Sequence, residues 1–292
     1  MGVSYADSVT GRIPHSGLLH ASIAPSGLSD PAAGPSPLVI GHRGAPGYRP
    51  EHTASSYRLA FAMGVDAVEP DVVCSRDGVL VIRHENEISG TTDVADRAEF
   101  ADRRTTKRID GEEVTGWFTE DLTWEELRTL RCRERLAAVR PGSAAHDGTD
   151  PILRLTDLLA LIATGSAQHG RRIGLVLEIK HATYYAGIGF DLADLVEQEL
   201  RAAGWADRAH PLWIESFERT VLADLRARGV QAQYVYLLEA EGAPADLVAR
   251  DGDAAATYGD SLTLPGLDAL VGTIDGISVD KRLLLEKDGG AL

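Results

Sequence analysis

The chain has 292 residues, of which 44% are hydrophobic and 25% are charged, a composition typical of a globular protein. This length allows one large domain or two ordinary ones, with ample residues for a core. The formal net charge of −15 argues against nonspecific nucleic-acid binding, because a phosphate backbone would be repelled. No run approaches the ~20 apolar residues of a membrane span, so no integral membrane segment is expected.

Residues 1–36 are rich in Gly, Ser, Ala and Pro, and we expect a flexible N-terminal arm there. His15 and His20 lie in this arm and are expected to be solvated. The arm lacks a basic region followed by a long apolar stretch, so the sequence as it stands indicates a cytoplasmic protein. Cys74 and Cys132 are far apart and imply no disulfide framework.

Most of the plausible chemistry lies in residues 38–92. The apolar run 38–41 is typical of a buried parallel strand, so His42 and Arg43 are expected at the tip of a strand. A helix is expected over residues 53–64, because a threonine can cap its start and a glycine suits its end.

A second strand is expected over residues 65–71, where side chains alternate between the two faces. Glu69 and Asp71 therefore point the same way, and two such carboxylates would repel each other unless a cation lay between them. This favours a divalent metal with oxygen ligands. After a tight Asp-Gly turn, a third strand over 79–84 ends at His84, so that an imidazole flanks the carboxylate pair on either side.

The motifs HRG, PEHT and ExD, followed by a strand that ends in His, resemble those of the glycerophosphodiester phosphodiesterase family. The TTDVADR run that follows is similar to its periplasmic-type bacterial branch, whose members are often exported, so a secreted or periplasmic location is the alternative. The match is dense over residues 38–100 and continues more sparsely to about residue 281. The resemblance implies hydrolysis of a small glycerophosphodiester to glycerol 3-phosphate and an alcohol. Catalysis by His42 and His84 with one divalent cation, Ca²⁺ or Mg²⁺, is also implied.

The resemblance also assigns roles to further residues. The LEIK sequence is similar to a family motif whose glutamate, here Glu178, completes the metal site begun by Glu69 and Asp71. Lys180 and Arg43 are then placed to bind the phosphate oxygens of the substrate.

Two acidic residues are expected to support these groups. Glu51 would hold Arg43 or a loop in place, and Glu85 would orient His84. The family usually has Asp after the strand-end His, so Glu85 is a departure by one methylene. His52 is expected to be structural, whereas Tyr184 and Tyr185 leave open a substrate wall or simple packing.

Residues 85–150 interrupt the regular alternation and are interpreted as an insertion at the mouth of a barrel. One helix is expected in it, beginning with a capping box at Thr123 and carrying an apolar stripe as far as Leu136. Its aromatic residues could line the substrate entrance or pack the insertion's own small core, and these are Trp117, Phe118 and Trp124.

The pattern of strands and helices predicts an α/β fold, a TIM (β/α)8-type barrel over residues 37–292 with its active site at the C-terminal ends of the strands. Thr156 and Ser216 are expected to cap two of the later helices. Only seven strands are expected, over 38–41, 65–71, 79–84, 173–180, 212–217, 233–238 and 276–279.

The last strand of the barrel is missing from this pattern, and an open barrel exposes two strand edges. We expect a truncated C-terminal end, with closure by the N-terminal arm as the alternative. Two other functions remain open at this stage: a phospholipase D-like lyase that releases cyclic phosphates from lysophospholipids, and a catalytically inactive barrel used for binding.

Overall fold

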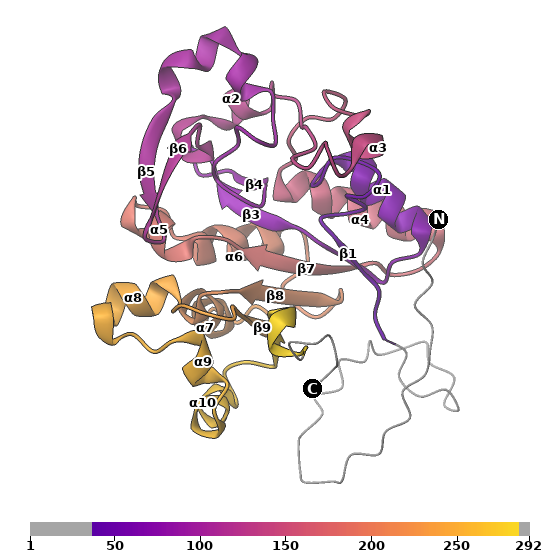
Figure 1. The fold of residues 1–292 in the computed structure, drawn as a ribbon. Coiled ribbons are helices and arrows are strands. Elements are labelled where there is room, and N and C mark those ends of the chain that lie inside the picture. The colour runs from indigo at the N-terminus through magenta and orange to yellow at the C-terminus, as the bar shows by residue number, and fades with distance from the viewer. Residues whose placement is uncertain (1–36, 286–292) are drawn as a thin grey trace. The chain divides into compact units, whose positions relative to one another are not determined.

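The computed structural model describes residues 37–285, so the expected N-terminal arm lies outside the described residues. Its main sheet has the strand order β1-β2-β7-β8-β9-β10, with β3 beside β7 and β4 beside β3 (Figure 1). The strands are β1 Ile40–His42, β2 Ala67–Glu69, β3 Asp71–Cys74, β4 Leu80–Ile82, β7 Gly174–Ile179, β8 Leu212–Ser216, β9 Gln233–Leu238 and β10 Gly276–Val279.

The seven predicted strands are all present. The predicted strand 65–71 appears as β2 and β3, which flank Pro70 and both pair in parallel with β7. The order of strands follows the chain, as in a barrel-type α/β sheet. Among residues 37–285, no pairing joins β1 to β10, so the sheet is open there.

The third predicted strand has an unexpected direction. β4 runs antiparallel to β3, with Val72 opposite Ile82 and Cys74 opposite Leu80. The expectation that all the chemistry lies at the ends of parallel strands is therefore wrong for His84. The hairpin instead brings the chain back to the start of β3, where the amide of Arg83, the residue before His84, donates to the carbonyl of Asp71.

The principal helices alternate with the strands, as predicted. They are α1 Ala54–Met63, α4 Leu155–His169, α6 Leu192–Ala202, α7 Arg219–Ala227, α8 Ala245–Asp251 and α10 Leu264–Leu270, with shorter helices α5 Ala182–Gly187 and α9 Tyr258–Ser261. Thr53 caps α1, accepting a hydrogen bond from the Ser56 amide, and Gly64 ends it in the left-handed conformation, both as predicted.

Two predicted caps are wrong. Helix α4 begins one residue before Thr156, with Arg154 at its N-cap, and α7 has Glu218 there instead of Ser216. The Ser216 hydroxyl is used differently: it accepts a hydrogen bond from the Glu218 amide and donates one to the carbonyl of Ile179 on the neighbouring strand.

The insertion carries its own antiparallel sheet, formed by β5 Thr105–Ile109 and β6 Glu112–Gly116. The helix predicted from Thr123 has its capping box but ends after one turn, as α2 Trp124–Leu127. It ends early because isolated bridges tie Cys132 to Thr92 and Arg131 to Pro151, which holds the following residues extended. The remaining short helices are α3 Pro141–Ala144, η1 Val94–Asp96, η2 Ala98–Arg103, η3 Thr119–Asp121, η4 Gly252–Ala254 and η5 Lys281–Leu283.

The aromatic residues of the insertion pack inward. Phe118 is fully buried and Trp117 is 8% exposed, which supports their role in a local core. Trp124 is half-buried, and the guanidinium of Arg154 lies over its ring. Across the described part of the chain, none of the helices has the length and apolar character that crossing a membrane requires.

Candidate active site

The inward faces of the strands form layers. Ala67, Val176 and Trp213 pack together as a small apolar cluster. Two residues further along the same strands come Glu69, Glu178 and Glu215. Because side chains two apart share a face, the next layer up is acidic.

The registers of the strands bring the candidate residues level with one another. Asp71 is opposite Glu178, and Glu178 is opposite Glu215. On the other side, His42 is opposite Glu69. Five chemically active side chains from β1, β2, β3, β7 and β8 therefore meet at one level of the sheet.

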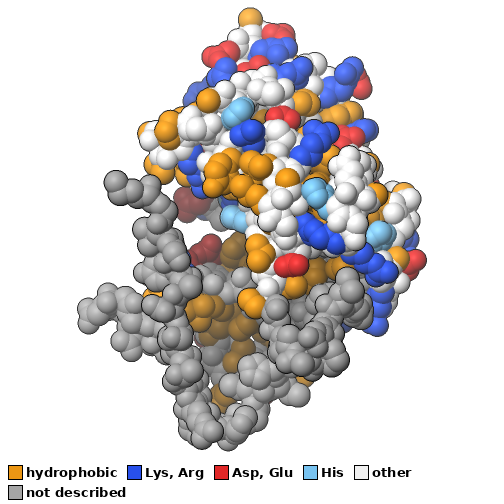
Figure 2. All heavy atoms as spheres, turned by 90° about the vertical axis from the view of Figure 1, so that its right-hand side faces the viewer, with side chains coloured by type: hydrophobic (Ala, Val, Ile, Leu, Met, Phe, Trp, Pro, Cys, Tyr) orange, Lys and Arg blue, Asp and Glu red, His pale blue; other side chains and the backbone are white. Residues whose placement is uncertain are grey.

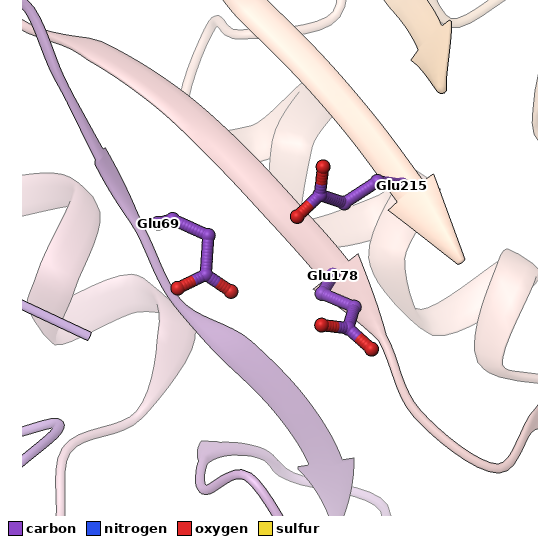
Figure 3. A group of neighbouring side chains, drawn as sticks. All are labelled: Glu69, Glu178 and Glu215. Carbon is purple, nitrogen blue, oxygen red and sulfur yellow. The ribbon is translucent and has the colours of Figure 1, made fainter. Parts of the chain in front are cut away.

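Three carboxylates converge most closely. Glu69, Glu178 and Glu215 each offer an oxygen, and these oxygens lie within 4.8 Å of one another. Figure 3 shows their carboxyl groups turned toward a common space between the strands. Sequence reasoning found Glu69 and Glu178 but missed Glu215. The signal was available, since Glu215 follows an inward apolar residue by two positions, as Glu69 and Glu178 do.

Asp71, the other predicted metal ligand, lies in a different environment. It is fully buried, its Oδ2 is 2.8 Å from Nε2 of His52 and 3.5 Å from Nε of Arg43, and its Oδ1 is 3.4 Å from Nζ of Lys180. Burial alone would raise the pKa of Asp71, but Lys180 and His52 hold it well below its usual range. Asp71 is therefore an ionised carboxylate among cationic and polar partners. His52 also contacts the Tyr57 hydroxyl, at 2.9 Å.

The carboxyls of the close group have raised pKa values. Burial and the neighbouring Asp71 and Glu178 raise the pKa of Glu69 well above its usual range. Burial raises that of Glu178 as well, against the opposing effect of Lys180, and burial together with Asp71 raises the pKa of Glu215 to about 7. A positive charge placed among them would remove this cost.

The backbone amide and the guanidinium of Arg43 each contact a carboxylate. Its amide donates to the Glu69 side chain at 3.0 Å, and its guanidinium lies 3.4 Å from Glu51. Glu51 also accepts a hydrogen bond from Arg135 at 2.9 Å, so it is held from two sides. Arg43 has a φ of 58°, a left-handed conformation that is uncommon for a residue with a long side chain.

The two candidate histidines differ in their surroundings. His42 is largely exposed, with its Nε2 3.8 Å from Glu69. His84 is more enclosed: its Nδ1 lies 2.7 Å from Glu85 and its Nε2 lies 3.1 Å from Nζ of Lys180. Because an ammonium group can only donate, Nε2 of His84 accepts and the ring proton is on Nδ1, facing Glu85.

Lys180 stands at the centre of the charged groups. Its Nζ is 2.6 Å from Glu178, and burial, which would lower its pKa, is outweighed by Glu178 and Asp71, which raise it. A cavity of about 500 Å³ opens beside it, bordered by the β5–β6 turn and by Phe217, Glu218 and Tyr258. Tyr184 lines this cavity, whereas Tyr185 is fully buried.

The formal net charge of −15 is the excess of 44 acidic over 29 Lys and Arg residues in the sequence. Lys and Arg side chains are prominent on the face shown in Figure 2, among histidines and hydrophobic side chains. The acidic groups described above are instead gathered inside the sheet.

Comparison with known proteins identifies the family. The sequence model of the glycerophosphoryl diester phosphodiesterase family matches residues 42–268. A glycerophosphodiester phosphodiesterase of Arabidopsis thaliana is 31% identical over 199 residues, covering 68% of this chain and 46% of the relative. One from Haemophilus influenzae is 28% identical over 190 residues, covering 62% of this chain and 50% of the relative. The chain thus spans about half the length of these curated relatives.

Solved structures support the fold. A phosphodiesterase of Oleispira antarctica, in complex with the product sn-glycerol-3-phosphate, has a TM-score of 0.57 and 22% identity, covering 84% of this chain and 76% of that one. A glycerophosphoryl diester phosphodiesterase from Silicibacter pomeroyi has a TM-score of 0.53 and 23% identity, covering 84% and 91%. The fold agrees with the barrel-type prediction, and the family match extends over most of the sequence. The chain belongs to the glycerophosphoryl diester phosphodiesterase family.

Proposed function

We propose that this protein hydrolyses glycerophosphodiesters to glycerol 3-phosphate and an alcohol, with the help of one divalent cation, Ca²⁺ or Mg²⁺. The observation that carries the proposal is the convergence of three carboxylates within 4.8 Å, with Lys180 paired to Glu178 and the amide of Arg43 bonded to Glu69. Family membership supports it, as does the sn-glycerol-3-phosphate bound by the Oleispira antarctica enzyme.

The residues present fit a hard cation. Oε1 of Glu69 is buried and has no hydrogen-bond partner among residues 37–285. Oxygen-rich, negatively charged sites of this kind suit Ca²⁺ and Mg²⁺. Glu69, Glu178 and Glu215 would hold the ion, with Asp71 beside them, opposite Glu178 in the sheet. When bound, the cation would neutralise a phosphate oxygen and polarise the phosphorus.

Two cationic side chains are placed to bind the phosphate. Lys180 supplies a point charge and Arg43 a planar group that can donate two parallel hydrogen bonds. Both are nearly buried, and Glu51 fixes the orientation of Arg43. A phosphodiester can therefore be attracted locally despite the overall negative charge.

The histidines supply proton transfer. His84 would remove a proton from the attacking hydroxyl or water through Nε2, whose lone pair is freed when Nζ of Lys180, 3.1 Å away, turns to the substrate phosphate. His42, on the other flank of the carboxylates, would then protonate the departing alkoxide. Oε1 of Glu85 lies 2.7 Å from Nδ1 of His84, and this ion pair would keep the ring oriented.

The test is a coupled assay of glycerol 3-phosphate release across several head groups. Chelation should abolish release, and added Ca²⁺ or Mg²⁺ should restore it. Replacing His42 or His84 by Ala should lower turnover by about 10² or more. His210 provides a matched control, because it stacks on Trp205 at the opposite end of β8, and His210→Ala should keep wild-type turnover.

Four outcomes would contradict the proposal. Activity that chelators leave unchanged would show that no metal is required. Near-wild-type turnover in His84→Ala would show that His84 is not an acid or base in the reaction. No release from any head group would favour an inactive barrel. A cyclic phosphate accumulating as the final product, seen by phosphorus NMR, would indicate a lyase instead.

A further inference from the structure

Four titratable side chains form a continuous chain from His84 to the hairpin of the insertion. Nδ1 of His84 lies 2.7 Å from Oε1 of Glu85, and the other oxygen of Glu85 lies 3.3 Å from Nε2 of His181. Nδ1 of His181 in turn lies 2.6 Å from Oδ2 of Asp110, in the turn between β5 and β6. His84 and Asp110, the two ends of this series of contacts, are 26 residues apart in sequence, and His181 comes from the end of β7.

The chemistry of the contacts fixes the state of His181. Each of its ring nitrogens faces a carboxylate oxygen, and an ionised carboxylate only accepts hydrogen bonds, so both nitrogens donate. Burial disfavours the charged ring, but Asp110 and Glu85 outweigh it and raise the pKa of His181 to about 9. His181 is therefore a cation between two carboxylates that would otherwise repel each other.

The backbone shows how tightly this link is held. His181 has a φ of 52°, a left-handed conformation that costs energy for a residue with a bulky side chain. It comes directly after Lys180 and begins α5. The ion pairs on both sides of the ring oppose this cost.

Glu85 needs such an anchor. Its side chain is 51% exposed, so a single contact with His84 would leave it free to rotate away into solvent. The second contact, to His181, restrains the carboxylate, and Asp110 restrains His181. The orientation of the His84 ring thus depends on residues that it does not touch.

We propose that His181 and Asp110 are positioning residues for His84, through which docking of the β5–β6 hairpin keeps that imidazole oriented for proton transfer. The catalytic part of this inference rests on the proposed function. The hairpin turn also borders the cavity beside Lys180, so the same docking builds a wall of the site.

Two variants test the inference in the full-length protein: His181→Asn and Asp110→Asn. Asparagine tolerates positive φ, and both positions require it, Asp110 having a φ of 47°. In each variant kcat should fall about tenfold or more, as when a group that orients a histidine is lost, while KM changes less than about twofold. Thr115→Val is the matched control, because it breaks only the exposed Thr106–Thr115 hydroxyl pair of the same hairpin and should leave both constants unchanged.

Wild-type kcat in both variants would overturn the inference. A rise in KM with unchanged kcat would also overturn it, because the hairpin would then only line the cavity. Circular dichroism checks the folding of each variant, and Asp110→Asn, at a solvent-facing turn, is the milder of the two.

A second readout does not depend on activity. In nitrogen-15 NMR at pH ~8, above the ordinary imidazole pKa of ~6.5, the ring of His181 should still carry both protons in the wild type and should lose one in Asp110→Asn. The charged groups in contact with this ring are Asp110 from the hairpin and Glu85 from the segment after β4. A ring that titrates identically in both proteins would overturn the inference. If the wild type hydrolyses no glycerophosphodiester, only the proposed function is contradicted. The NMR result would still decide for or against this series of contacts.

Discussion

Asp71 and Glu215 show that two carboxylates at the same level of a sheet can have opposite roles. Asp71 is surrounded by Arg43, His52 and Lys180 and is kept ionised by them. Glu215 is half-buried, and burial together with the charge of Asp71 raises its pKa to about 7. A cation near the carboxylates should therefore be coordinated more directly by Glu215 than the sequence motifs suggest.

The first prediction separates these roles. Glu215→Gln should weaken Ca²⁺ binding about tenfold or more with little loss of stability. Asp71→Asn should instead destabilise the fold by about 3–5 kcal/mol, because it leaves buried cationic groups without their partner. Calorimetric titration with Ca²⁺ and thermal unfolding measure the two effects. Glu239→Gln is the control, since Glu239 borders the cavity but lies outside the cluster, and unchanged Ca²⁺ affinity in Glu215→Gln would exclude Glu215 as a ligand.

How far residues could be assigned from the sequence depends on the range of the contact. Glu69 and Asp71 follow from strand alternation, because their relationship is local. The link between Glu85, His181 and Asp110 joins positions that are far apart in the chain, and no local pattern predicts it. It becomes visible only when the hairpin is seen docked on the end of β7.

At the scale of elements, the strands were predicted better than the insertion. β9 and β10 have the predicted bounds 233–238 and 276–279. β9 is mostly buried, as its apolar run indicates, whereas β10 is half-buried to exposed. The β5–β6 hairpin was missed, although Asp110 and Gly111 form a strong turn signal between its strands. Its strands are largely exposed and polar, so they lack the hydrophobic pattern that identifies a buried strand.

Packing between α1 and α4 gives a second prediction. A Cβ added at Gly165 of α4 would lie 2.6 Å from the ring of Phe61 in α1, so the helices approach closely only because this residue is glycine. Gly165→Ala should destabilise the protein by about 1–3 kcal/mol. Gly187→Ala is the matched control in a helix with open space around it, and it should be neutral or stabilising by up to about 1 kcal/mol. Denaturant unfolding measures both, and equal midpoints would show that α1 and α4 can separate without cost.

A third prediction concerns docking of the hairpin. The pKa of His181 is raised in the folded state to about 9, so its ion pairs stabilise docking fully below the ordinary value of 6.5. This stabilisation is lost as pH rises through about 9. Amide protection in β5 and β6, corrected for the intrinsic exchange rate, should therefore fall between pH 7 and 10 in the wild type. In Asp110→Asn the protection should already be low at pH 7, and a pH-independent wild type would contradict the role of His181.

At the scale of the whole molecule, the sheet combines an apolar lower layer with an acidic upper one. Ala67, Val176 and Trp213 fill the interior at one level, and the carboxylates crowd together at the next. This layering explains why the fold could be predicted from hydrophobic patterns. The residues of the site could be identified fully only once the register between the strands was known. It also makes the stability of the whole molecule sensitive to the charge of that upper layer.

The last prediction links metal, pH and global stability. The pKa values of Glu69 and Glu178 are raised in the folded state above the ordinary 4.5. Without metal, their favourable contribution is fully present below about pH 4.5 and is lost as pH rises through their folded values, because the fold must then hold adjacent buried charges. The metal-free protein should therefore unfold more easily at pH 8 than at pH 5.

Added Ca²⁺ should reverse this trend, because it binds the ionised carboxyls and protons compete with it at low pH. At a free concentration of about 100 times Kd, a ligand specific for the folded state stabilises it by about 2.7 kcal/mol. For a domain of this size that corresponds to a rise in Tm of roughly 5–11 °C. The rise should be larger at pH 8 than at pH 5 and should shrink in Glu215→Gln. A Tm that does not respond to Ca²⁺ or Mg²⁺ at either pH would mean that the carboxylates satisfy one another through shared protons. The site would then bind no divalent cation.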